Sequence, residues 1–180
     1  MPRLDSKPIE AAEGKTAQLF ATIRAAVGKV PNALADLGNN SPVTLEAALT
    51  LDGALRKSSL STRDIEAIKL AVSEAVGCDY CLAAHTLIAQ KAGLSHEAIL
   101  GLRRAMASGD AKLDALARFA RTLVTTRGTV PTEVVDAVKA GGYNDAQIAD
   151  TMLAIASITL TNLFNRVNDT VLDFPAAAAS

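Results

Sequence analysis

Residues 66–85 read EAIKLAVSEAVGCDYCLAAH, a stretch that combines a helical apolar pattern with reactive side chains. It contains both cysteines of the chain, Cys78 and Cys81, and one of its two histidines, His85. Apolar residues recur at helical spacing before Gly77, which predicts a helix with one buried face. Gly77 loosens the chain, so a second helix should begin at or near Cys78. The apolar stripe consists of Ile65, Ile68, Val72, Ala75 and Val76.

Helix start and stop signals on both sides of this stretch predict an all-α fold with eight to ten helices. No long alternation of β-branched and polar residues occurs, and no Asn-Gly or Asp-Gly turn is present. We expect the last helix to be bent or broken near residues 157–161. The helices are expected at about residues 13–27, 31–38, 42–57, 62–76, 78–93, 96–109, 112–127, 131–139 and 145–168.

Length and composition predict one domain over residues 1–180, with loose ends at residues 1–11 and 175–180. The chain is 49% hydrophobic and only 3% aromatic, so its core must be built from aliphatic and small side chains. The net charge of −1 and the absence of a basic block argue against nucleic acid as a partner. The longest apolar run, residues 152–164, is too short to span a bilayer and predicts a buried helix. Without the apolar run of a signal peptide, a cytoplasmic protein that does not bind membranes is expected.

Helical spacing places both sulfur atoms and the imidazole on one face of the second helix. Cys78, Cys81, His85 and Ala89 follow the i, i+3, i+7 and i+11 positions of such a face. Both cysteines lie in the first turn, where unpaired amides and the helix dipole favour a thiolate. His85, one turn later, can act as a base or carry a proton. These groups meet the needs of a thiol peroxidase or of a dithiol–disulfide oxidoreductase.

Two other interpretations of these residues stay open. The cysteines and the histidine can be ordinary core residues of an alanine-rich helix. A zinc site built from Cys78, Cys81, His85 and His96 is a further alternative, although His85 follows the cysteine pair too closely for the usual finger spacing. His96 follows the cap residue Ser95 and is expected at the surface.

Glu66 and Glu74 are the two candidates for a carboxylate that completes the site. Glu66 lies at the edge of the apolar stripe and can reach a neighbouring helix, whereas Glu74 lies opposite the stripe and should face water. The alternative for Glu66 is a surface ion pair with Lys69, which would stabilise the helix by only ~0.3–0.5 kcal/mol.

The segment from Leu60 to His85 resembles the AhpD-like alkylhydroperoxidases of the carboxymuconolactone decarboxylase superfamily. The shared pattern is a glutamate, a Cys-x-x-Cys pair twelve residues later and a histidine four residues after the second cysteine. Weaker similarities lie at residues 127–128, 140–143 and 160–165. The resemblance implies a helical fold that assembles as a trimer or hexamer. The resemblance also argues against a decarboxylase activity, because the lactone decarboxylases of the superfamily lack the cysteine pair.

The resemblance also implies roles for individual residues. Cys81 would attack a hydroperoxide, Cys78 would donate a proton and then close the disulfide, and Glu66 with His85 would relay protons to Cys81. An external dithiol would restore the thiols, and no cofactor or metal would be needed. Tyr80 stands where the best-known enzymes of this type carry a histidine, and its ordinary pKa near 10 makes it a poor proton carrier. The alternative is a dithiol oxidoreductase or redox sensor without peroxidase activity.

Overall fold

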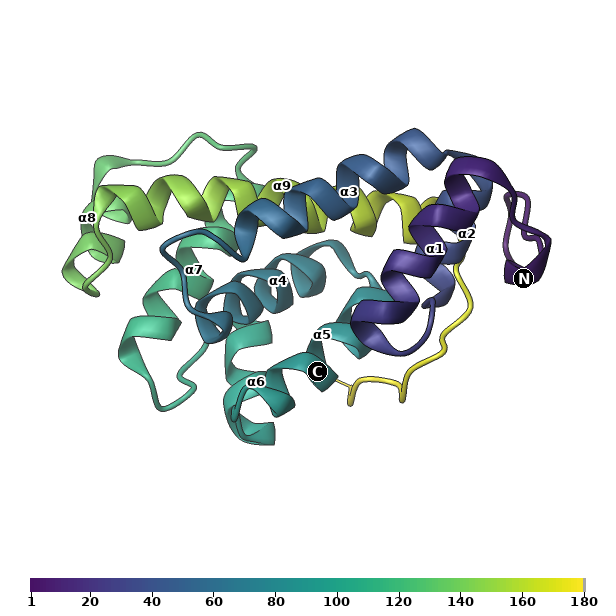
Figure 1. Cartoon of the computed structure of the whole chain (residues 1–180). Helices are drawn as coiled ribbons and strands as arrows, with labels where there is room; N and C mark the ends of the chain where they lie inside the picture. Colours follow the sequence, from purple (N-terminus) through teal and green to yellow (C-terminus); the bar gives the residue numbers. More distant parts are fainter. Residues whose placement is uncertain (180) are drawn as a thin grey trace.

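The computed structural model describes residues 1–179, and this part of the chain is helical without a strand (Figure 1). The prediction of an all-α fold with eight to ten helices is therefore confirmed. A short 3-10 turn, η1 (Ile9–Ala11), precedes the α-helices. The helices are α1 (Gly14–Val27), α2 (Asn32–Asn40), α3 (Pro42–Leu55), α4 (Thr62–Val76), α5 (Asp79–Lys91), α6 (His96–Arg104), α7 (Ala111–Thr125), α8 (Thr132–Ala140) and α9 (Asp145–Asn168).

Helix α4 is the centre of the molecule, because it packs against α5, α6, α7 and α9. Its residues from Glu66 to Ser73 are all buried, which is a wider face than the single apolar stripe expected from the sequence. Helices α3 and α9 lie side by side across one face, while α1 and α2 cover one end of the molecule (Figure 1). The start of α5, with both cysteines, thus follows directly after a helix whose middle is buried.

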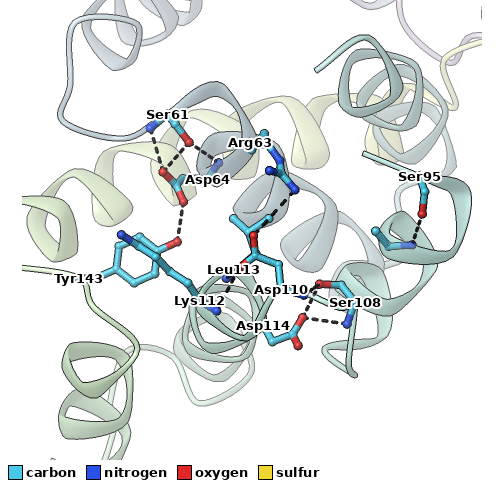
Figure 2. Close-up of polar contacts among 11 residues, drawn as sticks. Ser61, Arg63, Asp64, Ser95, Ser108, Asp110, Lys112, Leu113, Asp114 and Tyr143 are labelled. Atoms are coloured by element: carbon cyan, nitrogen blue, oxygen red, sulfur yellow. Dashed lines mark hydrogen bonds and ion pairs between the residues drawn. The ribbon is translucent and has the colours of Figure 1, made fainter. Parts of the chain in front are cut away.

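Side-chain caps fix where the central helices begin. Ser61 and Asp64 form a reciprocal capping box at the start of α4, and Asn144 with Gln147 forms another at the start of α9. Figure 2 shows that the Asp64 carboxylate also accepts a hydrogen bond from the buried Tyr143 hydroxyl, at 2.5 Å. Both caps lie at helix starts that the sequence predicted, and the Tyr143 bond ties the α8–α9 connection to α4.

Helix α9 departs from the sequence prediction in two ways. It runs without a break from Asp145 to Asn168, so the break expected near residues 157–161 is wrong. Its hydroxyl-bearing side chains form hydrogen bonds that do not interrupt the helix: Thr161 bonds back to the Ile158 carbonyl and Ser157 bonds to Asp52. Residues 152–164 are also less buried than expected, with Met152 and Leu163 exposed.

Within residues 1–179, α9 is the one helix whose length and composition are compatible with a membrane span. In the fold, however, it packs against α2, α3, α4 and α5. Its buried face carries polar groups, including Asn162 and Asn165, which belong to the interior of this domain.

Both ends of the chain make specific contacts where the sequence predicted loose segments. At the N-terminal end, the Arg3 amide donates to the Asn168 carbonyl and Ser6 donates to Asp36. At the C-terminal end, residues 170–179 (called the C-terminal segment below) run in an extended path from α9 past α5 to α6 (Figure 1). There the Arg103 guanidinium donates to the Ala178 carbonyl at 2.7 Å. Ser180, part of the expected loose end, lies outside the described residues.

Candidate active site

The α4–α5 junction places Cys78 at the N-cap of α5. Gly77 has φ +65°, a left-handed conformation that glycine adopts at little cost, and it ends α4. The Cys78 amide then donates to the Ser73 carbonyl at 3.0 Å, which folds the chain back onto the end of α4. Cys81 follows in the first turn of α5. The predicted start of the second helix is therefore confirmed.

Both cysteines are free thiols and both are buried, with exposed fractions of 1% for Cys78 and 3% for Cys81. A pocket reaches Cys78 from the surface between the start of α5, the end of α9 and the C-terminal segment. Its lining consists of Gly77, Cys78, Asp79, Tyr80, Asn165, Arg166, Asp169, Thr170 and Leu172. The pocket therefore gives small molecules a route toward Cys78.

The two thiols share a proton in the reduced protein. The Cys81 thiol donates a hydrogen bond to the Cys78 sulfur, and this bond holds the pKa of Cys78 below its ordinary value. The same bond, together with burial, raises the pKa of Cys81. A pair coupled this closely loses its first proton as a unit. These opposite shifts make Cys78, beside the pocket, the more acidic thiol of the pair.

Glu66 and His85 form the carboxylate–imidazole pair that the sequence predicted. The His85 Nδ1 atom lies 2.8 Å from a Glu66 carboxylate oxygen, and both side chains are largely buried. A carboxylate that binds one imidazole nitrogen fixes the ring orientation and leaves the other nitrogen for proton transfer. Among the described residues, no hydrogen bond joins His85 directly to either sulfur.

The alternative of a Glu66–Lys69 surface pair is wrong. Lys69 is buried and binds Asp52 of α3 instead, at 3.0 Å. Asp52 also accepts a hydrogen bond from Ser157 of α9 at 2.7 Å. Burial alone would raise the pKa of Asp52, but Lys69 and Ser157 together hold it below its ordinary value. Lys69 thus fixes α3 against α4 and leaves Glu66 to His85.

Glu74 lies outside the dithiol site, so the structure favours Glu66 as the carboxylate of the pair. The Glu74 carboxylate accepts a 2.6 Å hydrogen bond from Arg103 of α6, and its side chain is 16% exposed. The expectation that Glu74 faces water is therefore wrong. Arg103 in turn holds the C-terminal segment through Ala178, so this pair organises the surface near the chain end.

Tyr80, which lies between the two cysteines in sequence, anchors the C-terminal segment. Its hydroxyl accepts a hydrogen bond from the Ala33 amide at 3.1 Å and donates one to Asp173 at 2.6 Å. Its ring meets Phe174 edge to face. Burial and the neighbouring Asp173 carboxylate raise the pKa of Tyr80 well above its ordinary value. The hydroxyl of Tyr80 is thus engaged in anchoring the C-terminal segment.

The zinc alternative of the sequence analysis finds no support in the geometry. In residues 1–179, no three histidine, cysteine, aspartate or glutamate side chains lie close enough together to hold a metal ion. His96 begins α6 and is exposed, as expected.

Sequence reasoning missed the residue that touches the second sulfur. Asn165 of α9 donates from Nδ2 to the Cys81 sulfur at 3.4 Å. Asp52, which packs against the Glu66–His85 region, was missed as well. Both come from helices distant in sequence. The only available signal for Asn165 was its place in the weak similarity at residues 160–165.

Residues 42–122 match the carboxymuconolactone decarboxylase family model. The matched range runs from the start of α3 into α7 and so includes both cysteines, Glu66 and His85. No curated protein sequence matches the chain.

Solved structures with the same fold cover nearly the whole chain. An AhpD-core, peroxidase-related protein from Ralstonia eutropha JMP134 is similar with a TM-score of 0.84 and 20% identity, over 96% of this chain and 92% of that protein. A peroxidase-related protein from Silicibacter sp. TM1040 has a TM-score of 0.77 and 23% identity, over 94% and 91%. The debrominase Bmp8, solved in complex with 2,3,4-tribromopyrrole, has a TM-score of 0.73 and 19% identity, over 87% and 84%.

Replacing Tyr80→Phe removes the hydroxyl that holds the C-terminal segment. We expect this change to lower the free energy of unfolding by about 1–3 kcal/mol, because a buried bond to a carboxylate is lost. Hydrogen exchange should become faster in residues 170–179, and alkylation of the thiols should not become slower. Tyr143→Phe is the matched control: it loses its own bond to Asp64 and should leave exchange in residues 170–179 unchanged. Slower thiol alkylation in Tyr80→Phe would contradict a purely anchoring role and indicate that the Tyr80 hydroxyl carries a proton to or from the thiols.

Replacing Cys81→Ala removes the thiol that stabilises the Cys78 thiolate. The pKa of Cys78 should then rise, because burial still opposes its ionisation while its hydrogen-bond donor is gone. Less thiolate will be present near neutral pH, so alkylation of Cys78 by iodoacetamide should become slower and its pH midpoint should move upward. Peptide mass spectrometry across a pH series measures this, with His96→Ala as the control. An unchanged midpoint would show that the two thiols do not share a proton.

Proposed function

The chain is an AhpD-like member of the carboxymuconolactone decarboxylase superfamily, and we propose that it is a thiol peroxidase that reduces hydroperoxides through Cys78 and Cys81. The observation that carries the proposal is the placement of two coupled thiols at the start of α5, with the Glu66–His85 pair one turn further along. The pocket beside Cys78 supplies the entry route.

In the first step, Cys81 attacks the hydroperoxide. The shared hydrogen bond makes Cys78 the immediate acceptor of the Cys81 proton, and the Asn165 amide stabilises the Cys81 thiolate. The Cys81 sulfur then bonds to the terminal oxygen of the hydroperoxide, which carries the hydrogen, while the O–O bond breaks. Cys81 becomes a sulfenic acid. The departing alkoxide takes the proton now held on Cys78 and leaves as an alcohol.

In the second step, the Cys78 thiolate attacks the sulfenic sulfur of Cys81. The S–S bond forms and the hydroxyl group leaves, taking a proton supplied by His85, so that water is released. Glu66 holds the imidazole for this transfer. An external dithiol then reduces the disulfide and returns two protons and two electrons. The cycle needs no metal or cofactor, and the physiological reductant is a dithiol of unidentified structure.

A dithiol–disulfide oxidoreductase or redox sensor is the second candidate, since it uses the same two thiols. The low exposure of both sulfurs favours the peroxidase, because a small hydroperoxide fits a narrow pocket more easily than a protein disulfide does. Similarity to a debrominase makes 2,3,4-tribromopyrrole a third substrate to assay. Relative rates toward an organic hydroperoxide, a protein disulfide and this bromopyrrole separate the three activities.

A cytoplasmic homo-oligomer, trimer or hexamer, is part of the proposal. Exposed apolar side chains support self-association, and two of them, Leu163 and Val167, lie close together on α9. Light scattering at micromolar concentration measures the assembly state.

The two cysteine variants test the assignment of roles. After one equivalent of organic hydroperoxide, Cys78→Ser should carry a sulfenic acid on Cys81, because no second thiol remains to close the disulfide. Cys81→Ser should form no sulfenic acid, and both variants should lack turnover with a dithiol donor. Intact-mass analysis with a sulfenic-acid trap gives the readout. Trapping on Cys78 in the Cys81→Ser variant would reverse the two roles, and unchanged turnover would exclude the dithiol cycle.

Replacing Glu66→Gln should slow peroxide turnover by about 10- to 100-fold, as expected when the partner that orients a functional imidazole is lost. Glu74→Gln is the matched control on the same helix, because its carboxylate binds Arg103 instead. We expect Glu74→Gln to retain turnover close to that of the wild type in a coupled assay. Equal losses in both variants would show that the effect is structural.

A further inference from the structure

Two asparagines on α9 face the dithiol region and have hydrogen-bonding capacity that the fold does not use. Asn162 and Asn165 are three residues apart, so their side chains lie on the same face of the helix. They are 2% and 5% exposed. Asn165 also lines the pocket that reaches Cys78.

In each of the two side-chain amides, only one of the two polar atoms forms a hydrogen bond. Asn165 donates from Nδ2 to the Cys81 sulfur at 3.4 Å, while its Oδ1 has no partner within residues 1–179. Asn162 accepts at Oδ1 from the Ser73 hydroxyl at 3.1 Å, while its Nδ2 has no partner in the same part of the chain. An acceptor is thus unused on the residue that contacts Cys81, and a donor is unused on the same helix face three residues earlier.

Such atoms are rare in native interiors and require an explanation, because an unpaired buried polar atom destabilises the fold. In the described part of the chain, the only other buried side-chain atom of this kind is Thr86 Oγ1 of α5. Asn168, one turn further along α9, shows the structural use of an asparagine. Its Nδ2 donates to Asp36 and Thr170, and its Oδ1 accepts from the Leu4 amide. The spare atoms of Asn162 and Asn165 are therefore not a general property of this helix.

The unused pair matches the hydrogen-bonding groups of a hydroperoxide. A hydroperoxide has one O–H donor and a second oxygen that can only accept. We propose that Asn165 and Asn162 bind the –O–O–H group, with Asn165 Oδ1 accepting from its hydroxyl and Asn162 Nδ2 donating to its alkyl-bearing oxygen. This assignment rests on the peroxidase function proposed above.

Bound in this way, the hydroperoxide is oriented for the attack by Cys81. Asn165 contacts both the attacking sulfur and the hydroxyl that it attacks, so the amide sets their relative position. As the S–O bond forms and the O–O bond breaks, negative charge develops on the alkyl-bearing oxygen. In the proposed binding mode, the Asn162 N–H donates to this oxygen and stabilises the charge until the Cys78 proton arrives. A protein disulfide has no O–H donor, so the pair favours hydroperoxides over disulfides.

The test compares reaction with a hydroperoxide against reaction with a reagent that needs no such binding. Single-turnover oxidation by tert-butyl hydroperoxide and alkylation of the two thiols by iodoacetamide are measured on the reduced protein, together with its Tm. We expect Asn162→Leu to oxidise at least about tenfold more slowly while its alkylation rate and Tm are not reduced. Asn165→Leu should lose rate in both reactions, with the larger loss in oxidation. Asn162→Asp, which keeps the shape but replaces the donor with an acceptor, should behave like Asn162→Leu if the leucine variant does not fold.

Asn168→Leu is the matched control, since it removes a fully paired asparagine from the same helix. It should lower Tm and leave the oxidation rate of the folded protein unchanged. Oxidation of the Asn162 and Asn165 variants within about twofold of the wild type would overturn the binding role and leave the peroxidase function standing. A wild-type protein that reacts with tert-butyl hydroperoxide no faster than free cysteine would instead overturn the peroxidase function, and the binding role with it.

Discussion

Burial of the middle of α4, residues 66–73, sets the main requirement of this fold. A helix packed against four others must pair the polar side chains that it buries, because an unpaired buried charge is far more costly than an exposed one. Helix α4 meets this requirement by pairing five polar side chains, each with a different segment of the fold. The pairs are Asp64–Tyr143, Glu66–His85, Lys69–Asp52, Ser73–Asn162 and Glu74–Arg103.

These pairs do more than stabilise packing, because they also build the site. Binding of Lys69 by Asp52 leaves the Glu66 carboxylate for His85. Binding of Asn162 by Ser73 holds the polar face of α9 against the end of α4, where the chain turns at Gly77 into the cysteine pair. The same helix therefore supplies the support for the imidazole, the thiols and the asparagines. A change that improved the packing of α4 by removing its polar groups would remove the site as well.

The C-terminal segment adds a second layer over this centre. Asp173 binds the Tyr80 hydroxyl and the Lys29 ammonium, and Leu172 lines the pocket that reaches Cys78. The tyrosine between the cysteines thus connects the chemistry of α5 to the position of the chain end. This role explains why a residue that carries protons poorly is compatible with the position directly before Cys81.

Local sequence pattern was enough to predict most helix boundaries and the chemistry of the cysteine helix. Caps such as Ser61 and Asn144, the turn at Gly77, and the spacing of Cys78, Cys81 and His85 depend only on neighbours within a few residues, so they were readable from local pattern. The hydrogen-bonding partners of the buried side chains depended on how the helices pack. Local pattern could not show whether Lys69 binds Glu66 or Asp52, what the Tyr80 hydroxyl binds, or whether Asn165 reaches Cys81. These contacts join segments that are distant in sequence. Asp52 and Ser157, for example, are 105 positions apart. Local periodicity fixes which face of a helix is buried, whereas the identity of the side chain opposite is set only when the helices pack.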